Sequence, residues 1–250
     1  MRVLGGVVDL KGKVALVTGG AVRLGRAIAL GLAQSGADVA ITYNRSGGPA
    51  DDVVAELEGM GRRSLAVQAD FAQASDMAEL VDRVVASLGA LGVLVNSAAI
   101  FEPGEWDTTT EENWDRHHDI NLKAPFFLSQ AFARHVQARE GHGHIVNIAD
   151  WRGVRPGTDH VAYTLTKVAL VGMTRSLAQA LAPAIRVNAI APGLILPPPG
   201  AGPEFVERAA AAIPMERWGS ADGIVKAVRY LLDSDFVTGD LLYVTGGEHL

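Results

Sequence analysis

Short apolar runs alternate with longer amphipathic stretches from residue 13 almost to the end of the chain, and this alternation constrains the fold most. Valine, isoleucine and leucine fill the apolar runs almost continuously, as expected for strands buried on both faces of a parallel sheet. We predict strands at 13–18, 38–43, 63–68, 91–96, 144–149, 185–190 and 241–245. We predict helices at about 24–35, 50–60, 74–89, 111–138, 159–182 and 220–233. The pattern indicates an α/β fold, a single-domain Rossmann-type doubly wound parallel sheet of about seven strands with helices on both faces.

No internal repeat and no linker divides the 250 residues, so we predict one domain spanning residues 1–250. One segment breaks the rhythm: LILPPPGAGPEF at 194–205, whose prolines and glycines are incompatible with regular structure. It follows the sixth predicted strand, at the carboxyl end of the sheet, where substrates of such folds bind. We therefore predict that 194–215 forms a substrate lid, a loop with a short helix; a disordered surface loop is the alternative.

Composition excludes several classes of site. The chain has no cysteine, which excludes disulfides, thiolate zinc sites and cysteine nucleophiles. Its formal net charge of −6 argues against a surface that follows nucleic-acid phosphates. No run approaches the roughly 20 apolar residues that a membrane helix needs, and the first residues are too interrupted for a signal peptide. We expect a cytoplasmic protein with no membrane or nucleic-acid partner.

Two histidine pairs raise the question of a metal site. His117 and His118 are adjacent in a predicted helix and point in different directions. His142 and His144 precede a predicted strand, with no acid at ligand spacing nearby. We interpret all four as solvated surface residues and predict no metal.

The first predicted strand runs directly into Thr18-Gly19-Gly20-Ala21-Val22-Arg23-Leu24-Gly25 and then a helix. Glycines at this point allow a tight turn and a close approach of the backbone to a pyrophosphate. Arg23 replaces the central glycine of the usual pattern, which costs backbone freedom but adds N–H donors beside phosphates. We predict that Gly19, Arg23, Leu24 and Gly25 bind a dinucleotide; an arginine exposed at the start of a helix is the alternative for Arg23.

The end of the second predicted strand bears on the choice between NAD and NADP. An acid there binds a ribose 2′-hydroxyl, whereas a basic residue binds a 2′-phosphate. Asn44-Arg45-Ser46 contains no acid and can hold a phosphate by charge-assisted hydrogen bonds, so we predict NADPH. After the third strand, Asp70 and Phe71 are placed to reach the adenine. After the fourth, Asn96, Ser97 and Ala98 are placed where the cofactor crosses the sheet edge.

Tyr163 and Lys167 are four residues apart in a predicted helix, so their side chains leave the same face. A tyrosine has an ordinary pKa of about 10. A lysine cation one turn away favours the phenolate, and we expect it to lower the pKa of Tyr163. The pair is therefore predicted to move a proton. Asp150 ends the apolar run HIVNIAD thirteen residues earlier.

Several of these motifs also resemble those of a known protein family. The TGxxxxxG turn, Asn96-Ser97-Ala98, Asn121, Tyr163-x-x-x-Lys167 and Pro192-Gly193 together resemble the short-chain dehydrogenase/reductases, from about Lys11 to the final GGEHL. Four details are similar to pteridine reductases and bacterial dihydromonapterin reductases in particular. They are Arg23 in the glycine turn, the YNRS segment, Phe101, and Asp150 where most members have a catalytic serine.

The resemblance implies a role for each residue. Tyr163 would donate the proton, Lys167 would hold the nicotinamide ribose, and Asn121 would position a water that links the lysine to solvent. Asp150 would pair with Tyr163 and act in proton delivery, and Phe101 would stack on the substrate. Arg23 would contact phosphate and substrate, and Pro192 and Gly193 the carboxamide of the cofactor. A homotetramer, with 111–138 and 159–182 as packing faces, is also implied.

Asp150 separates two substrate classes. A serine donates a hydrogen bond to a substrate carbonyl, whereas an ionised aspartate cannot donate and would repel a developing alkoxide. We therefore expect an NADPH-dependent reductase of a pterin C=N bond, acting on a dihydromonapterin-, dihydrobiopterin- or dihydrofolate-like substrate. The alternatives are a general carbonyl or 3-oxoacyl-carrier-protein reductase of the same family and, more distantly, a non-catalytic NADP-binding sensor.

Overall fold

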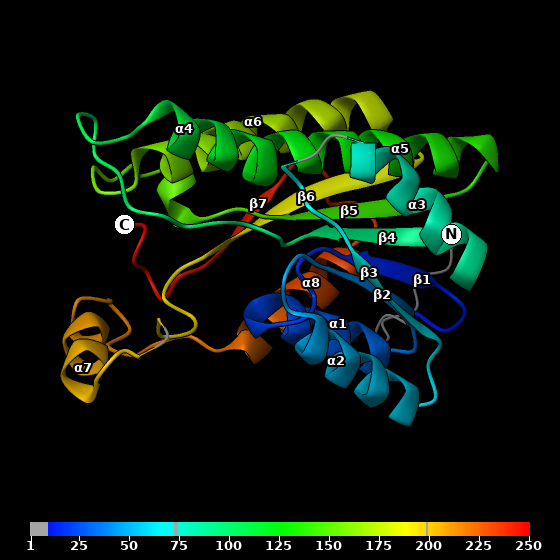
Figure 1. The fold of residues 1–250 in the computed structure, drawn as a ribbon, viewed down its shortest axis with the longest axis horizontal. Coiled ribbons are helices and arrows are strands. Elements are labelled where there is room, and N and C mark those ends of the chain that lie inside the picture. Colours follow the sequence, from blue (N-terminus) through cyan, green and yellow to red (C-terminus); the bar gives the residue numbers. More distant parts are fainter. Residues whose placement is uncertain (1–9, 73–74, 199) are drawn as a thin grey trace.

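The computed structural model describes residues 10–72, 75–198 and 200–250, and these ranges form one α/β unit (Figure 1). Its parallel sheet has seven strands in the order β3-β2-β1-β4-β5-β6-β7, which confirms the predicted doubly wound architecture. The strands are β1 (Val14–Val17), β2 (Asp38–Tyr43), β3 (Ser64–Gln68), β4 (Leu91–Asn96), β5 (Gly143–Ile148), β6 (Ile185–Pro192) and β7 (Leu241–Val244). The α-helices are α1 (Arg23–Gln34), α2 (Gly47–Gly59), α3 (Ser75–Leu88), α4 (Glu111–His118), α5 (Ala124–Ala138), α6 (Val161–Leu181), α7 (Pro203–Ala211) and α8 (Ala221–Asp233).

Two helix layers cover the sheet. Helices α1, α2 and α8 lie on one face and α3 to α6 on the other (Figure 1). Successive residues of a strand point to opposite faces. Accordingly Ala15 and Val17 of β1 pack in the core under α1 and α8, whereas Val14 and Leu16 pack in the core under α3 and α5. This two-sided burial explains why the strands read as continuous apolar runs.

The long helix predicted at 111–138 is not one regular α-helix. Between α4 and α5 the chain makes a wider π-helical turn over Asp119–Lys123. Asn121 lies in this turn and is buried. π-turns inside helices occur frequently at functional sites, and this one delivers a side chain to the site described below.

The lid segment is partly regular. Helix α7 begins at Pro203, so the prediction of irregular structure through residue 205 was wrong for the last three positions. A proline is compatible with the first turn of a helix, because its missing N–H would have no intrahelical partner there. None of the α7 residues is buried, and the helix projects from the body of the molecule (Figure 1). Residues 1–9, 73–74 and 199 of the predicted domain lie outside the described residues. They include residue 74, the first residue of the helix predicted at 74–89, and residue 199 of the predicted lid.

Two of the four histidines predicted to be solvated are buried. His144 lies in β5, where its Nε2 accepts a hydrogen bond of 3.0 Å from the Asn188 amide. Burial, reinforced by the charge of Arg186, lowers the pKa of His144 to about 3, so the ring is neutral. His117 of α4 is also fully buried. Adjacent helix positions do diverge, as predicted, but here one of the two points inward.

Within the described ranges, no helix has the length and apolarity needed to cross a membrane. Over the same ranges, no three His, Asp or Glu side chains gather in a way that would hold a metal ion.

Candidate active site

A cleft of about 350 Å³ opens at the carboxyl ends of β1, β2 and β4. The chain order of the sheet reverses between β1 and β4, and ligands of open α/β sheets bind at such a point. Eight of the residues predicted to bind the cofactor line this cleft: Gly19, Arg23, Leu24, Gly25, Asn44, Phe71, Ser97 and Ala98.

The glycine turn forms a closely packed edge of the cleft. Gly19 has a φ of +64°, which favours glycine, and a Cβ on Gly25 would clash with the Gly19 carbonyl. Thr18 Oγ1 accepts hydrogen bonds from the backbone N–H groups of Ser97 (2.9 Å) and Ala98 (3.0 Å), which joins the ends of β1 and β4. Bare backbone next to a helix N-terminus suits a pyrophosphate. The residues present therefore fit a dinucleotide.

Arg23 adopts a left-handed backbone conformation, with a φ of +50°. Glycine adopts such a conformation readily, whereas for an arginine it is strained, which is the backbone cost expected of this replacement. Its guanidinium donates to the carbonyls of Leu196 and Pro197, at 3.2 Å each, and so connects the glycine turn with the 194–215 segment. The sequence did not predict this contact.

The other predicted cofactor residues lie outside the cleft wall. Arg45 is exposed, Ser46 directly precedes α2, and the Asp70 carboxylate accepts from the N–H of Ala72 at 3.1 Å. The buried Asn96 amide donates to Asn147 Oδ1 at 2.8 Å, so its side chain belongs to the core rather than to the cleft.

Pro192 ends β6, and the N–H of the next residue, Gly193, donates to the Val244 carbonyl at 3.0 Å. Directly after them, the Leu194 N–H donates to the carboxylate of Glu248 at 3.0 Å. Neither Pro192 nor Gly193 lines the cleft. The sequence did not single out Glu248, whose carboxylate holds the first residue of the 194–215 segment.

Tyr163 and Asp150 form the central polar contact of the site. The Tyr163 hydroxyl donates to Asp150 Oδ2 at 2.7 Å, and Asp150 Oδ1 accepts from the Arg152 N–H at 2.8 Å. Tyr163 is buried, with 7% of its surface exposed. Burial, the charge of Asp150 and this hydrogen bond raise the pKa of Tyr163 well above its ordinary value. The direction is opposite to the one predicted from Lys167, and the phenol is therefore protonated at neutral pH.

Lys167 is buried and donates from Nζ to the Ile148 carbonyl at 2.8 Å. Burial lowers the pKa of Lys167 to about 8, against the opposing effect of Asp150. Nζ lies 5.5 Å from the centre of the Tyr163 ring. Ile148 also lines the cleft, so this hydrogen bond connects Lys167, which lies beside Tyr163, to the cleft wall.

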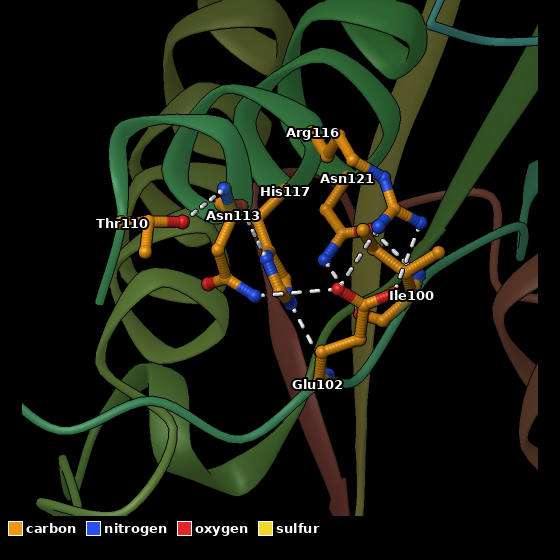
Figure 2. A network of polar contacts seen from close by, with 7 residues as sticks. All are labelled: Ile100, Glu102, Thr110, Asn113, Arg116, His117 and Asn121. Atoms are coloured by element: carbon orange, nitrogen blue, oxygen red, sulfur yellow. Dashed lines mark hydrogen bonds and ion pairs between the residues drawn. The ribbon is translucent and has the colours of Figure 1, made fainter. Parts of the chain in front are cut away.

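Asn121 holds the backbone of Ile100, another residue of the cleft wall (Figure 2). Its Oδ1 accepts from the Ile100 N–H at 2.9 Å, and its Nδ2 donates to the Ile100 carbonyl at 3.0 Å. Both contacts come from the π-turn. The role of Asn121 in a water relay stays a prediction.

His117 holds the other side of the same segment (Figure 2). Its Nε2 accepts from the Glu102 N–H at 3.2 Å, and its Nδ1 donates to the Asn113 carbonyl at 2.7 Å. The Glu102 carboxylate in turn pairs with Arg116 at 2.9 Å. A sequence signal existed: Asn113, His117 and Asn121 follow one another at intervals of four, the spacing of one helix face.

Phe101 lies in the chain between Ile100 and Glu102, the two residues that these hydrogen bonds hold. It also lies beside Tyr163. The rings of Phe101 and Tyr163 meet edge to face, with centroids 4.6 Å apart. Phe101 is 55% exposed, so part of its ring is open to a ligand. The structure thus brings Phe101, Asp150, Tyr163 and Lys167 together, with a protonated hydroxyl held by a carboxylate next to an aromatic surface.

Several known proteins are similar to this chain over almost its whole length. Residues 20–249 match the protein family described as enoyl-(acyl carrier protein) reductase. The 3-oxoacyl-[acyl-carrier-protein] reductase of Staphylococcus aureus is 35% identical over 243 residues, covering 95% of this chain and 98% of that protein.

Two solved structures are equally similar. FolM alternative dihydrofolate reductase 1 from Brucella canis, complexed with NADP, is 36% identical, with a TM-score of 0.90 over 97% of this chain and 96% of that one. A blue fluorescent protein from a metagenomic library, in complex with NADPH, is 37% identical, with a TM-score of 0.89 over 96% of this chain and 99% of that one. The fold, the glycine turn, the Tyr163–Lys167 pair and these similarities agree: the chain belongs to the short-chain dehydrogenase/reductase family.

Proposed function

We propose that this protein is an NADPH-dependent reductase that transfers a hydride to a C=N bond of a dihydropterin. One observation carries the proposal, the 2.7 Å hydrogen bond from the Tyr163 hydroxyl to Asp150 beside the exposed ring of Phe101. A carboxylate at this point stabilises a protonated ring nitrogen and repels a developing alkoxide.

The proposed cofactor rests on the cleft and on the relatives. The glycine turn and the small residues Ser97 and Ala98 leave room for a dinucleotide. The turn Asn44-Arg45-Ser46 directly after β2 contains no acid, and the exposed Arg45 is available to a 2′-phosphate. Both solved relatives described above contain NADP or NADPH. When bound, the nicotinamide supplies the hydride.

The residues of the chain supply the proton and the orientation. Tyr163 is protonated and donates its hydroxyl proton to the ring nitrogen, while the neighbouring carbon receives the hydride, so that C=N becomes CH–NH. The buried ammonium of Lys167 then stabilises the phenolate that is left. Asp150 holds the hydroxyl in place before transfer, and Phe101 offers a flat apolar surface to the substrate.

A second candidate is a 3-oxoacyl-carrier-protein reductase. It is favoured by the 35% identity with the staphylococcal enzyme of that name. The two candidates differ in what Asp150 must do, because a carbonyl oxygen needs a hydrogen-bond donor and not an acceptor.

The test measures NADPH oxidation with dihydromonapterin, dihydrobiopterin, dihydrofolate and an acetoacetyl thioester. We expect turnover of at least one dihydropterin substrate, and little turnover of the thioester. Asp150→Ser should lower kcat/KM for the dihydropterin by about 100-fold or more and raise that for the thioester. Tyr163→Phe, the matched control, should abolish both reactions and leave NADPH binding intact. Turnover of the thioester alone would establish the second candidate.

A further inference from the structure

His160, which no sequence pattern singled out, closes a ring of contacts around the site. The ring begins at the Tyr163 hydroxyl, which donates a hydrogen bond to Asp150. The Asp150 carboxylate also accepts a hydrogen bond from the backbone N–H of Arg152. The Arg152 guanidinium pairs with Asp159 at 2.5 and 3.2 Å. Asp159 lies 3.0 Å from Nδ1 of His160. The His160 ring then stacks on Phe101, and Phe101 meets Tyr163.

The rings of His160 and Phe101 stack almost parallel to each other. The two ring planes are 5° from parallel, and their centroids are 3.9 Å apart. The His160 side chain is only 17% exposed, whereas Phe101 is 55% exposed. The imidazole therefore covers one face of Phe101 from within the protein. Tyr163 contacts the Phe101 ring as well, and the part of the ring that stays exposed is available to a ligand.

The backbone and an ion pair fix His160 from two sides. A short bridge joins Gly104 to residues 159–161: the Val161 N–H donates to the Gly104 carbonyl at 2.8 Å, and the Gly104 N–H donates to the Asp159 carbonyl at 3.3 Å. Arg152 pairs with Asp159, and the Asp159 carboxylate lies 3.0 Å from Nδ1 of the imidazole. A side chain so constrained loses little further entropy when a ligand packs against its partner.

We propose that His160 is a positioning and specificity-determining residue: it fixes the plane of the Phe101 ring so that a flat heteroaromatic substrate stacks beside Tyr163. The inference rests on the proposed function for the identity of that substrate. It adds that a second ring supports the stacking surface from behind, next to the Arg152–Asp159 pair that adjoins Asp150.

The kinetic test compares His160→Leu, which removes the second ring, with His160→Phe, which restores an aromatic ring. An aromatic pair contributes enough that its loss should raise the KM of a dihydropterin about three- to tenfold, with a smaller change in kcat. His160→Phe should bring KM back to within about twofold of wild type. The KM of a small aliphatic ketone should rise less than that of the dihydropterin in His160→Leu.

His118→Leu is the matched control, because His118 stacks on Trp114 of α4, with centroids 4.2 Å apart, outside the ring of contacts. It should leave KM unchanged. An unchanged KM in His160→Leu, or a His160→Phe variant no better than the leucine variant, would overturn the proposal.

A second measurement does not depend on the substrate. In proton NMR spectra of the wild-type protein, the ring protons of His160, assigned by their absence in His160→Phe, should lie upfield because of the Phe101 ring current. Phe101→Leu should move them to ordinary positions, and no movement would refute the stack. Failure of the proposed function would instead show as a wild-type enzyme that reduces no dihydropterin while these signals behave as expected.

Discussion

At the scale of single residues, two neighbours have opposite effects on the pKa of Tyr163. The sequence places a lysine one helical turn away, which favours the phenolate, and a nearby aspartate, which opposes it. The aspartate prevails, because its carboxylate contacts the hydroxyl directly at 2.7 Å, whereas Lys167 Nζ is hydrogen-bonded to the Ile148 carbonyl. Burial of the phenol acts in the same direction as the aspartate and is the largest cause of the raised pKa.

Asp150→Asn should therefore lower the pKa of Tyr163. The substitution removes the negative charge and the carboxylate acceptor, both of which raise that pKa in the wild-type protein. Ultraviolet titration of tyrosinate measures the change. The chain has 4 tyrosines, so subtraction of the Tyr163→Phe titration isolates the signal. An unchanged or higher pKa would show that Asp150 does not control the phenol.

The parts of the candidate site that depend on the regular spacing of residues along a helix could be predicted from the sequence. The helical interval between Tyr163 and Lys167 predicted that both side chains leave one helix face. In the structure both are buried, and Asp150 lies within hydrogen-bond distance of the hydroxyl. The direction of the pKa shift was not predictable, because it depends on which group contacts the hydroxyl. His160 was missed for the same reason, since its partner Phe101 is far away in sequence.

At the scale of secondary-structure elements, strands were easier to predict than helices. An uninterrupted apolar run between turns leaves little choice of boundary, and predicted and observed strands differ by at most two residues at either end. The break at Asp119–Lys123 left no mark in the sequence, because one extra residue in a turn hardly alters an apolar pattern of period 3.6. The start of α7 was obscured by the prolines around it.

The glycine turn before α1 gives the sharpest prediction at this scale. Gly25→Ala should destabilise the protein by about 1–3 kcal/mol, because the new Cβ would clash with the Gly19 carbonyl and distort the turn. NADPH affinity should fall with it. Chemical denaturation and cofactor titration measure the two effects.

Gly59→Ala is the control for this substitution. Gly59 is the exposed last residue of α2, and a Cβ there would meet no atom within 4 Å. Alanine should stabilise that helix by about 0.5–1 kcal/mol. A Gly25→Ala variant as stable as wild type would mean that the turn tolerates a side chain.

At the scale of the whole molecule, one helix layer leaves large apolar side chains uncovered. Phe126 and Phe127 of α5 are 38% and 42% exposed, and Leu165 and Val168 of α6 are 41% and 39% exposed. A hollow of about 410 Å³ next to them is lined by Leu122, Met173 and the two phenylalanines, among others. Exposed apolar surface of this kind marks an interaction site. We infer that α5 and α6 pack against a second copy of the chain, in the homotetramer that the sequence resemblance implied.

Light scattering coupled to size exclusion should accordingly give the mass of a tetramer. The double substitution Phe126→Glu with Phe127→Glu should yield smaller species, because it places charge in the apolar contact. Phe236→Glu is the matched control, since Phe236 is 100% exposed and follows α8 on the opposite face of the sheet. A wild-type mass equal to one chain would refute the assembly.

The π-turn at Asp119–Lys123 gives α4 and α5 a common axis but different phases. Each residue of an α-helix advances by about 100°, so one additional residue within a turn rotates everything after it by that amount. The half before the turn is thereby aimed at the loop that carries Phe101, and the half after it at the sheet, where Leu128 and Phe132 are buried. The number of residues in the turn, rather than their chemistry, therefore decides whether α4 faces the Phe101 loop while α5 faces the sheet. A deletion of one residue would misalign the two halves even if every remaining side chain were kept.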